Sequence, residues 1–367
     1  MTFNISGVNI NGVNIYDSTG LYNFTTFTFK TGNVSGPVGA TGSQLFANSY
    51  SNVGNTWLQT TSFYNTYGNG YQFWTVPTSG NYTITAAGAR AGIPYFTPGN
   101  VANGNLTAGW GALVQGTFTL TQGQILTLVV GQMSGNAVAG ATYSSTGGGG
   151  ASWVVTATGS PLLVAGGGGG GGNFTSGTPN SVKGGNGVTT NSGGASTKGA
   201  PGGTNGNGGN SHIAPNGSTS SNSYDAGAGG GMYSNGVAGS GANLRSNVSS
   251  SAQSAGGGLS FSAGLLGGLA AASYLSGESS GGFGGGGGAG PITGGGGGGY
   301  SGGAGTWTPV NTQTDAGGGG GSYIDSTATA VATSDGFYNS NSTFNGSNIT
   351  NLSSLNYGHG YITITRV

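Results

Sequence analysis

The stretch PLLVAGGGGGGG, residues 161–172, decides the fold, because the apolar run Pro161–Ala165 leads directly into seven glycines. Branched aliphatic side chains favour a β-strand in the first half. Seven glycines cannot form an ordinary α-helix, since each costs about 1 kcal/mol there. They can form an extended helix of the polyproline II type, whose backbone groups have no internal partners and can bond to neighbouring helices. The stretch predicts a strand followed by a laterally bonded glycine helix.

Glycine supplies 87 of the 367 residues, and 61 of these glycines lie between Gly147 and Gly321. This distribution predicts an all-β chain in three parts. A β-sandwich begins in residues 48–165 and closes in residues 322–367. Residues 166–321 form a large inserted bundle of polyglycine-II-type helices between them.

The flanks carry alternating apolar patterns typical of strands. Turn residues between neighbouring patterns predict three hairpins, and the chain closes with a strand over residues 360–367. The predicted hairpins join 73–76 to 82–86, 117–120 to 125–130, and 152–155 to 162–165.

Residues 1–47 are rich in Asn and Thr, with short alternations such as Val8-Asn9-Ile10. We interpret this segment as an attachment or oligomerisation arm, with an additional edge strand as the alternative. It has no basic start, apolar core or cleavage motif, so no Sec signal is expected.

Charge and chemistry exclude several classes of function. Six basic and six acidic residues give zero net charge, so neither nucleic acid nor a membrane is an expected partner. The chain has no Cys and two His, and its carboxylates are isolated in sequence. We therefore predict no enzyme activity, no cofactor and no metal, and interpret His212 and Asp225 as a solvated pair. The apolar stretch Leu259–Leu275 is too polar to span a membrane and is expected to pack, with exposure as the alternative.

Candidate contact residues lie in the non-glycine segments between glycine runs, where loops should emerge at the ends of the bundle. Aromatic side chains offer rigid contact area in such loops. The alternative is that these side chains cap the bundle or dock it on the sandwich. The candidates are Tyr224, Asp225, Met232, Tyr233, Tyr274 and Trp307.

Five motifs in residues 57–367 follow one another in a characteristic order. They are FWTVPTSGNY at 73–82, AAGA at 86–89, GGGGAS at 147–152, PLLVA with its seven glycines, and GGGGGSY at 317–323. These motifs resemble the glycine-rich ectodomain region of anaplastic lymphoma kinase and leukocyte tyrosine kinase, and glycine-rich proteins of marine phages and large algal viruses. This resemblance implies a jelly-roll-like β-sandwich with an inserted bundle of polyglycine helices.

The inserted region is also similar to polyglycine tip adhesins of phage tail fibres, whose loops contact the host. The resemblance implies a non-enzymatic virion surface protein, a fibre or receptor-binding adhesin, assembled in the host cytoplasm and released on lysis. Its expected partners are a host-surface receptor (glycan or protein), other virion proteins and further copies of itself. The alternatives are a structural capsid decoration or fibre shaft, an ice- or surface-binding protein, and a secreted matrix protein.

Overall fold

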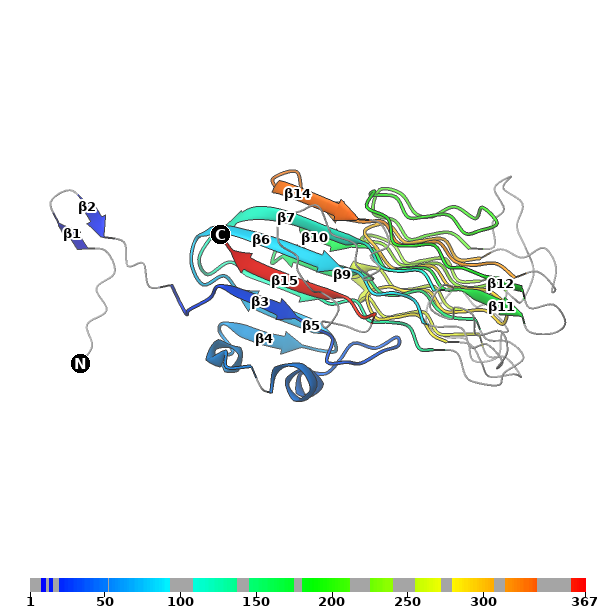
Figure 1. Ribbon diagram of the computed structural model, residues 1–367, viewed down its shortest axis with the longest axis horizontal. Coiled ribbons are helices and arrows are strands. Elements are labelled where there is room, and N and C mark those ends of the chain that lie inside the picture. Colours follow the sequence, from blue (N-terminus) through cyan, green and yellow to red (C-terminus); the bar gives the residue numbers. More distant parts are fainter. Residues whose placement is uncertain are drawn as a thin grey trace.

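The structure is a computed structural model (Figure 1). It describes residues 20–51, 53–92, 108–136, 145–174, 180–211, 225–239, 255–271, 279–306, 314–334 and 358–367, together with the backbone of 8–10 and 13–15.

Two antiparallel sheets form the body of the molecule, which confirms the predicted β-sandwich class. The first has six strands in the order β13-β10-β9-β8-β5-β4, and the second has five in the order β14-β7-β6-β15-β3. The strands of the first are β13 (Tyr323–Ile324), β10 (Pro161–Ala165), β9 (Ser152–Thr156), β8 (Ile125–Val129), β5 (Tyr71–Thr75) and β4 (Tyr64–Tyr67). Those of the second are β14 (Thr329–Ser334), β7 (Leu113–Leu120), β6 (Gly80–Ala87), β15 (Tyr361–Arg366) and β3 (Thr26–Phe29).

The core lies between the sheets and follows the alternation of the strands. Trp74 of β5 and Tyr82 of β6 are fully buried and pack edge-on, with ring centroids 5.8 Å apart. Val154 of β9 faces this core, whereas its neighbours Trp153 and Val155 face the opposite side of the sheet. The six-stranded sheet is therefore buried on both faces.

Of the three predicted hairpins, only β9–β10 is confirmed by antiparallel pairing. The other two predictions are wrong, because β5 and β6 lie in different sheets, as do β7 and β8. In both cases the turn carries the chain across the sandwich. Two consecutive strands show the same apolar alternation whether they pair within one sheet or pack face to face in two sheets. The pattern therefore could not distinguish a hairpin from a crossing between the sheets.

Part of the predicted arm belongs to the sandwich. β3 pairs with β15, and Phe27 and Phe29 enter the core, so the edge-strand alternative holds for this segment. The chain continues through α1 (Gly42–Leu45), the π-helix η1 (Phe46–Tyr50) and the 3₁₀-helix η2 (Thr56–Gln59). Ahead of them, β1 (Val8–Ile10) and β2 (Val13–Ile15) form a separate two-stranded sheet.

The glycine region continues from the strand ends at one end of the sandwich (Figure 1). Three strand pairs, β6–β7, β8–β9 and β10–β13, each lead out into glycine segments and return. Residues 88–92 and 108–112 belong to it, since the Ala112 N–H donates to the Gly166 carbonyl at 2.8 Å. Residues 145–150 also belong, since the Gly149 N–H donates to the Gly168 carbonyl at 2.7 Å. The predicted start at residue 166 omits these earlier segments.

Backbone hydrogen bonds between segments hold this region together with a period of three residues. The N–H groups of Gly167 and Gly170 donate to Gly298 and Gly295, at 2.8 and 2.7 Å, in one antiparallel neighbour. Residues between them donate to other neighbours, and the carbonyl groups follow the same period. Each segment is thus bonded on several sides, unlike a strand in a flat sheet.

Turns of the glycine region pack on the outer face of the six-stranded sheet. Met232, Leu265 and Phe283 form a second core cluster with residues such as Trp153 and Val164. Leu265 is fully buried, as the packing interpretation of the Leu259–Leu275 stretch expects, while Leu269 is partly exposed. The glycine region is therefore joined to the sandwich by an apolar contact as well as by its strands.

In the part of the chain that the structure describes, no helix has the length and apolar character needed to cross a membrane.

Candidate functional site

The structure separates the six candidate contact residues. Tyr233 is the exposed one of those described, with 60% of its side chain accessible, whereas Asp225 and Met232 are buried at 0% and 5%. Met232 docks the glycine region on the sheet, which is the alternative considered for these side chains. Tyr224, Tyr274 and Trp307 lie outside the described residues.

The burial of Asp225 corrects its interpretation as a solvated residue. Its main chain lies inside the glycine region, where the Asp225 carbonyl accepts a hydrogen bond from the Ala255 N–H at 3.5 Å. His212, the proposed second member of the pair, is outside the described residues. The described part of the chain has no cluster of three or more His, Asp or Glu that could hold a metal ion.

Tyr233 belongs to a row of three tyrosines at the junction of the glycine region and the sandwich. The rings of Tyr300 and Tyr323 stack, with centroids 4.5 Å apart and planes at 24°. Tyr233 meets Tyr300 edge-on, with centroids 6.4 Å apart and planes at 75°. Tyr300 and Tyr323 are half-buried, so Tyr233 is the most exposed member of the row. We call Tyr233, Tyr300 and Tyr323 the tyrosine row.

Three adjacent segments position the row through their backbones. The Tyr300 N–H donates to the Gly321 carbonyl at 2.8 Å, and the Tyr300 carbonyl accepts from the Met232 N–H at 2.8 Å. The Tyr233 N–H donates to the Gly206 carbonyl at 2.8 Å. Gly206 has a φ of +81°, and a Cβ there would lie 2.6 Å from the Tyr233 ring. Glycine is required at this position to let the ring lie flat against the chain.

The hydroxyl groups of Tyr300 and Tyr323 stay protonated at neutral pH. Burial raises the pKa of Tyr300, and the neighbouring hydroxyl of Tyr233 adds to the effect. Burial also raises the pKa of Tyr323, together with the charge of Asp325, whose carboxylate accepts its hydrogen bond at 3.3 Å. The row therefore offers aromatic faces beside neutral hydroxyl donors, a combination suited to partners that carry both apolar surface and polar groups.

Buried Asp315 serves a structural purpose instead. Its carboxylate accepts hydrogen bonds from the hydroxyls of Ser196 and Thr197 and, at 3.1 Å, from the Lys198 N–H. The same carboxylate accepts the Ala316 N–H at 2.8 Å. These donors fix the turn at 196–199 against the glycine region, so the acid is occupied by its own chain.

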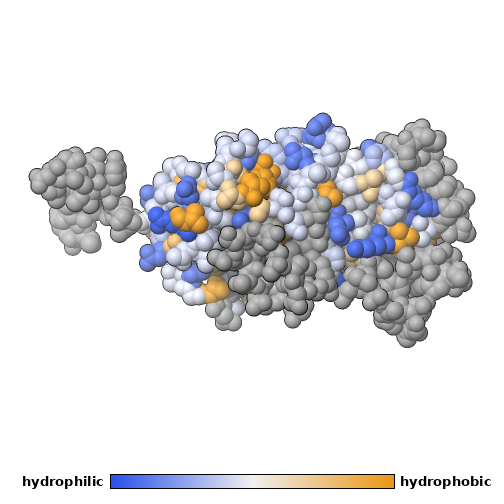
Figure 2. Space-filling model, turned by 45° about the horizontal axis from the view of Figure 1, so that its top comes forward, coloured by the Kyte–Doolittle hydropathy of each residue, from blue (hydrophilic) through white to orange (hydrophobic). Residues whose placement is uncertain are grey.

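Sequence reasoning found Tyr233 but missed Tyr300 and Tyr323. All three follow a glycine run within two residues, after Gly231, Gly299 and Gly321 respectively. An aromatic residue at the end of each run is the signal that could have located them together. On the face drawn in Figure 2, apolar side chains are scattered as small patches among polar ones.

Comparison of the chain with protein-family models and with curated proteins gives no match.

Proposed function

We propose that this chain is a non-enzymatic adhesive protein of a virion surface, a fibre or receptor-binding protein that contacts a host-surface glycan or protein. The observation that carries the proposal is the tyrosine row, held by backbone bonds from three segments. Tyr233 exposes 60% of its side chain there. Rigid, accessible aromatic side chains are the commonest anchors of protein recognition sites.

We further propose that the glycine region is a bundle of polyglycine-II-type helices on a jelly-roll-like sandwich. Three observations on Gly166–Gly172 support it: the three-residue bonding period, the absence of bonds within the run, and φ angles outside the left-handed region. An extended helix with three residues per turn has these properties. Such a bundle would hold the tyrosine row rigidly, which lowers the entropy lost on binding.

The virion location rests on the resemblance to glycine-rich virus proteins, as do the other virion proteins expected as partners. The aromatic and hydroxyl groups of the row support a receptor recognised by stacking and hydrogen bonds instead of ion pairs. The carboxylate of Asp325, which accepts the Tyr323 hydroxyl, is also bonded to the Thr327 hydroxyl and N–H. A neutral glycan or a polar protein loop fits this chemistry best.

The test is binding of the labelled full chain to immobilised neutral glycans, acidic glycans and host surface proteins. We expect binding to at least one neutral glycan or surface protein, and at least a tenfold loss with Tyr233→Ala, since a true anchor contributes about 2 kcal/mol or more. Tyr67→Ala is the matched control, because Tyr67 is 76% exposed on β4, apart from the row.

Equal losses from Tyr233→Ala and Tyr67→Ala would refute a role for the row. No binding to any probe by the folded chain would instead favour the structural alternative, a capsid decoration or fibre shaft. Circular dichroism and the melting temperature establish that each variant is folded, since Tyr233 contributes ring contacts to Tyr300.

A further inference from the structure

The five-stranded sheet ends at β3, whose outer edge is open. Among the described strands β3 pairs with β15 alone. The Arg366 N–H donates to the Thr25 carbonyl at 2.8 Å, so hydrogen-bonded and non-bonded pairs alternate from there. Thr26 and Thr28 then belong to the pairs whose backbones are not hydrogen-bonded to β15. The short distances between their hydroxyls and the threonine hydroxyls of β15, 2.8 and 2.9 Å, agree with this. The backbone N–H and C=O groups of Thr26 and Thr28 therefore point outward.

The same edge is closed at its far end by side chains. The Lys30 N–H also points outward, as the next alternate residue after Thr28, and it donates to the Tyr50 hydroxyl at 2.9 Å. The Lys30 carbonyl accepts from the Gln72 side-chain amide at 3.1 Å. The Tyr50 hydroxyl in turn donates to the side-chain amide oxygen of Gln72 at 2.8 Å, inside the protein. This network satisfies Lys30 and leaves the edge open only over the two threonines.

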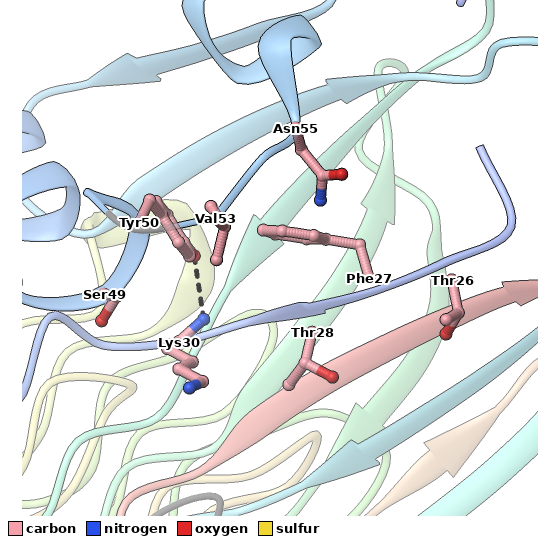
Figure 3. Close-up of a pocket in the computed structure, with 8 residues that line it drawn as sticks. All are labelled: Thr26, Phe27, Thr28, Lys30, Ser49, Tyr50, Val53 and Asn55. Carbon is pink, nitrogen blue, oxygen red and sulfur yellow. Dashed lines mark hydrogen bonds between the residues drawn. The ribbon is translucent and has the colours of Figure 1, made fainter. Parts of the chain in front are cut away.

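A pocket of about 260 Å³ lies along the open edge, between β3 and residues 49–55 (Figure 3). Phe27 and Tyr50 give it an apolar floor, and Val53, 39% exposed, lies on the opposite wall. The Ser49 hydroxyl at its margin is buried without a partner. Open backbone groups beside an apolar hollow are the features that admit an added strand.

The N-terminal hairpin likewise has no third strand beside it among the described strands. β1 and β2 pair with each other and with no other described strand, and a lone two-stranded hairpin is marginally stable in water. Its register joins Val8 to Ile15 across a two-residue turn, so Asn9 and Asn14 direct their backbone groups outward. The hairpin lies beyond the end of its own sandwich and does not pair with the outer edge of its own β3 (Figure 1).

The charged residues near the hairpin and near the open edge of β3 have opposite signs. Asp17 is the one charged residue in the first nineteen, and it follows the hairpin directly. The basic residue Lys30 lines the pocket. Strand addition would bring opposite charges to the same edge.

We propose that the N-terminal hairpin of a second copy of this chain adds to the open edge of β3, continuing the five-stranded sheet across two molecules. The contact uses the N–H and C=O groups of Thr26 and Thr28, with the pocket receiving an apolar side chain of the hairpin. Because each copy has one hairpin and one edge, the exchange is either mutual in a dimer or sequential in a fibre.

Sedimentation of the full chain from low to high micromolar concentration tests this. We expect the wild type to self-associate, and Thr28→Pro to sediment as a monomer, since proline removes an outward N–H without breaking the pairing with β15. Thr66→Pro on β4 is the matched control: the Thr66 N–H also faces away from its neighbouring strand, and it donates to its own neighbour Asn65. This control should associate like the wild type.

A second variant, Asn9→Pro with Asn14→Pro, blocks the hairpin and avoids any change to the sandwich. It should also be monomeric, and amide exchange of Thr26 and Thr28 should accelerate relative to the associated wild type. A monomeric wild type at every concentration, or association that survives both changes, would overturn the proposal. Slow exchange at Thr26 and Thr28 in a monomer would assign the edge to the chain's own hairpin, which also overturns it.

Discussion

Replacing one central glycine should destabilise the protein by an amount that the structure sets. A Cβ at Gly169 would overlap the carbonyl oxygen of Gly317, and it would lie 2.6 Å from the carbon of that carbonyl and 2.7 Å from the Gly318 oxygen. The carbonyl carbon would have to move by about 0.8 Å to reach the 3.4 Å of an ordinary contact, and its oxygen would have to move further. Such a movement stretches the 3.0 Å bond from the Gly317 N–H to the Gly170 carbonyl.

For Gly169→Ala we expect a loss of about 2 to 5 kcal/mol, combining about 1–3 for overpacking with about 1–2 for weakened hydrogen bonds. The entropy of unfolding for a chain of this length is about 0.8 kcal/mol/K, so the melting temperature should fall by about 3 to 6 °C. The larger, β-branched side chain in Gly169→Val should lower it further.

Gly135→Ala is the matched control within the same region. Among the residues that the structure describes, a Cβ at Gly135 would meet only the Cβ of Ser279, at 3.4 Å, which is an ordinary contact. Calorimetry of both variants should therefore show a change below about 1 °C for Gly135→Ala, because one methyl group at such a site costs little. If Gly169→Ala and Gly135→Ala have the same melting temperature, the glycine segments do not pack as closely as described. The proposal of a polyglycine bundle would then be refuted.

Three further results are expected. Binding that depends on Tyr233 should change little between low and high salt, as measured on the same immobilised probes, because stacking and neutral hydrogen bonds are weakly screened. Burial, together with the charge of Arg90, lowers the pKa of His359 to about 4, so the unfolded chain binds a proton first as pH falls below 6.5. The melting temperature should decline from pH 6.5 toward pH 4, and His359→Asn should flatten that decline. Asp315→Ala should lower stability in urea by about 2 to 4 kcal/mol by leaving buried donors unpaired, whereas Asp325→Ala, at a half-exposed site, should cost far less.

The fold class followed from local patterns because each strand carries its own alternation. Ile84 of β6 and Leu163 of β10 are buried by that alternation alone, whichever sheet each joins. The assignment of strands to sheets depends on contacts far apart in sequence, as with β3 and β15, which no local pattern encodes. The tyrosine row has the same origin, since Tyr233 and Tyr323 both contact Tyr300 only after their segments have been placed beside it.

The boundary of the glycine region escaped prediction because glycine runs mark only the segments that neighbouring backbones approach at successive residues. A Cβ at Gly168 would lie 2.8 Å from the Trp110 nitrogen, and Cβ atoms at Gly167 and Gly169 would likewise meet backbone atoms. Segment 88–92 is also buried but carries glycine only at its two ends, with Gly88 against the carbonyl group of Gly166, while the residues between carry side chains. Such a segment needs glycine only where a neighbouring backbone approaches. Spaced glycines that directly follow a strand are therefore a second pattern to seek in such a region, beside the glycine runs.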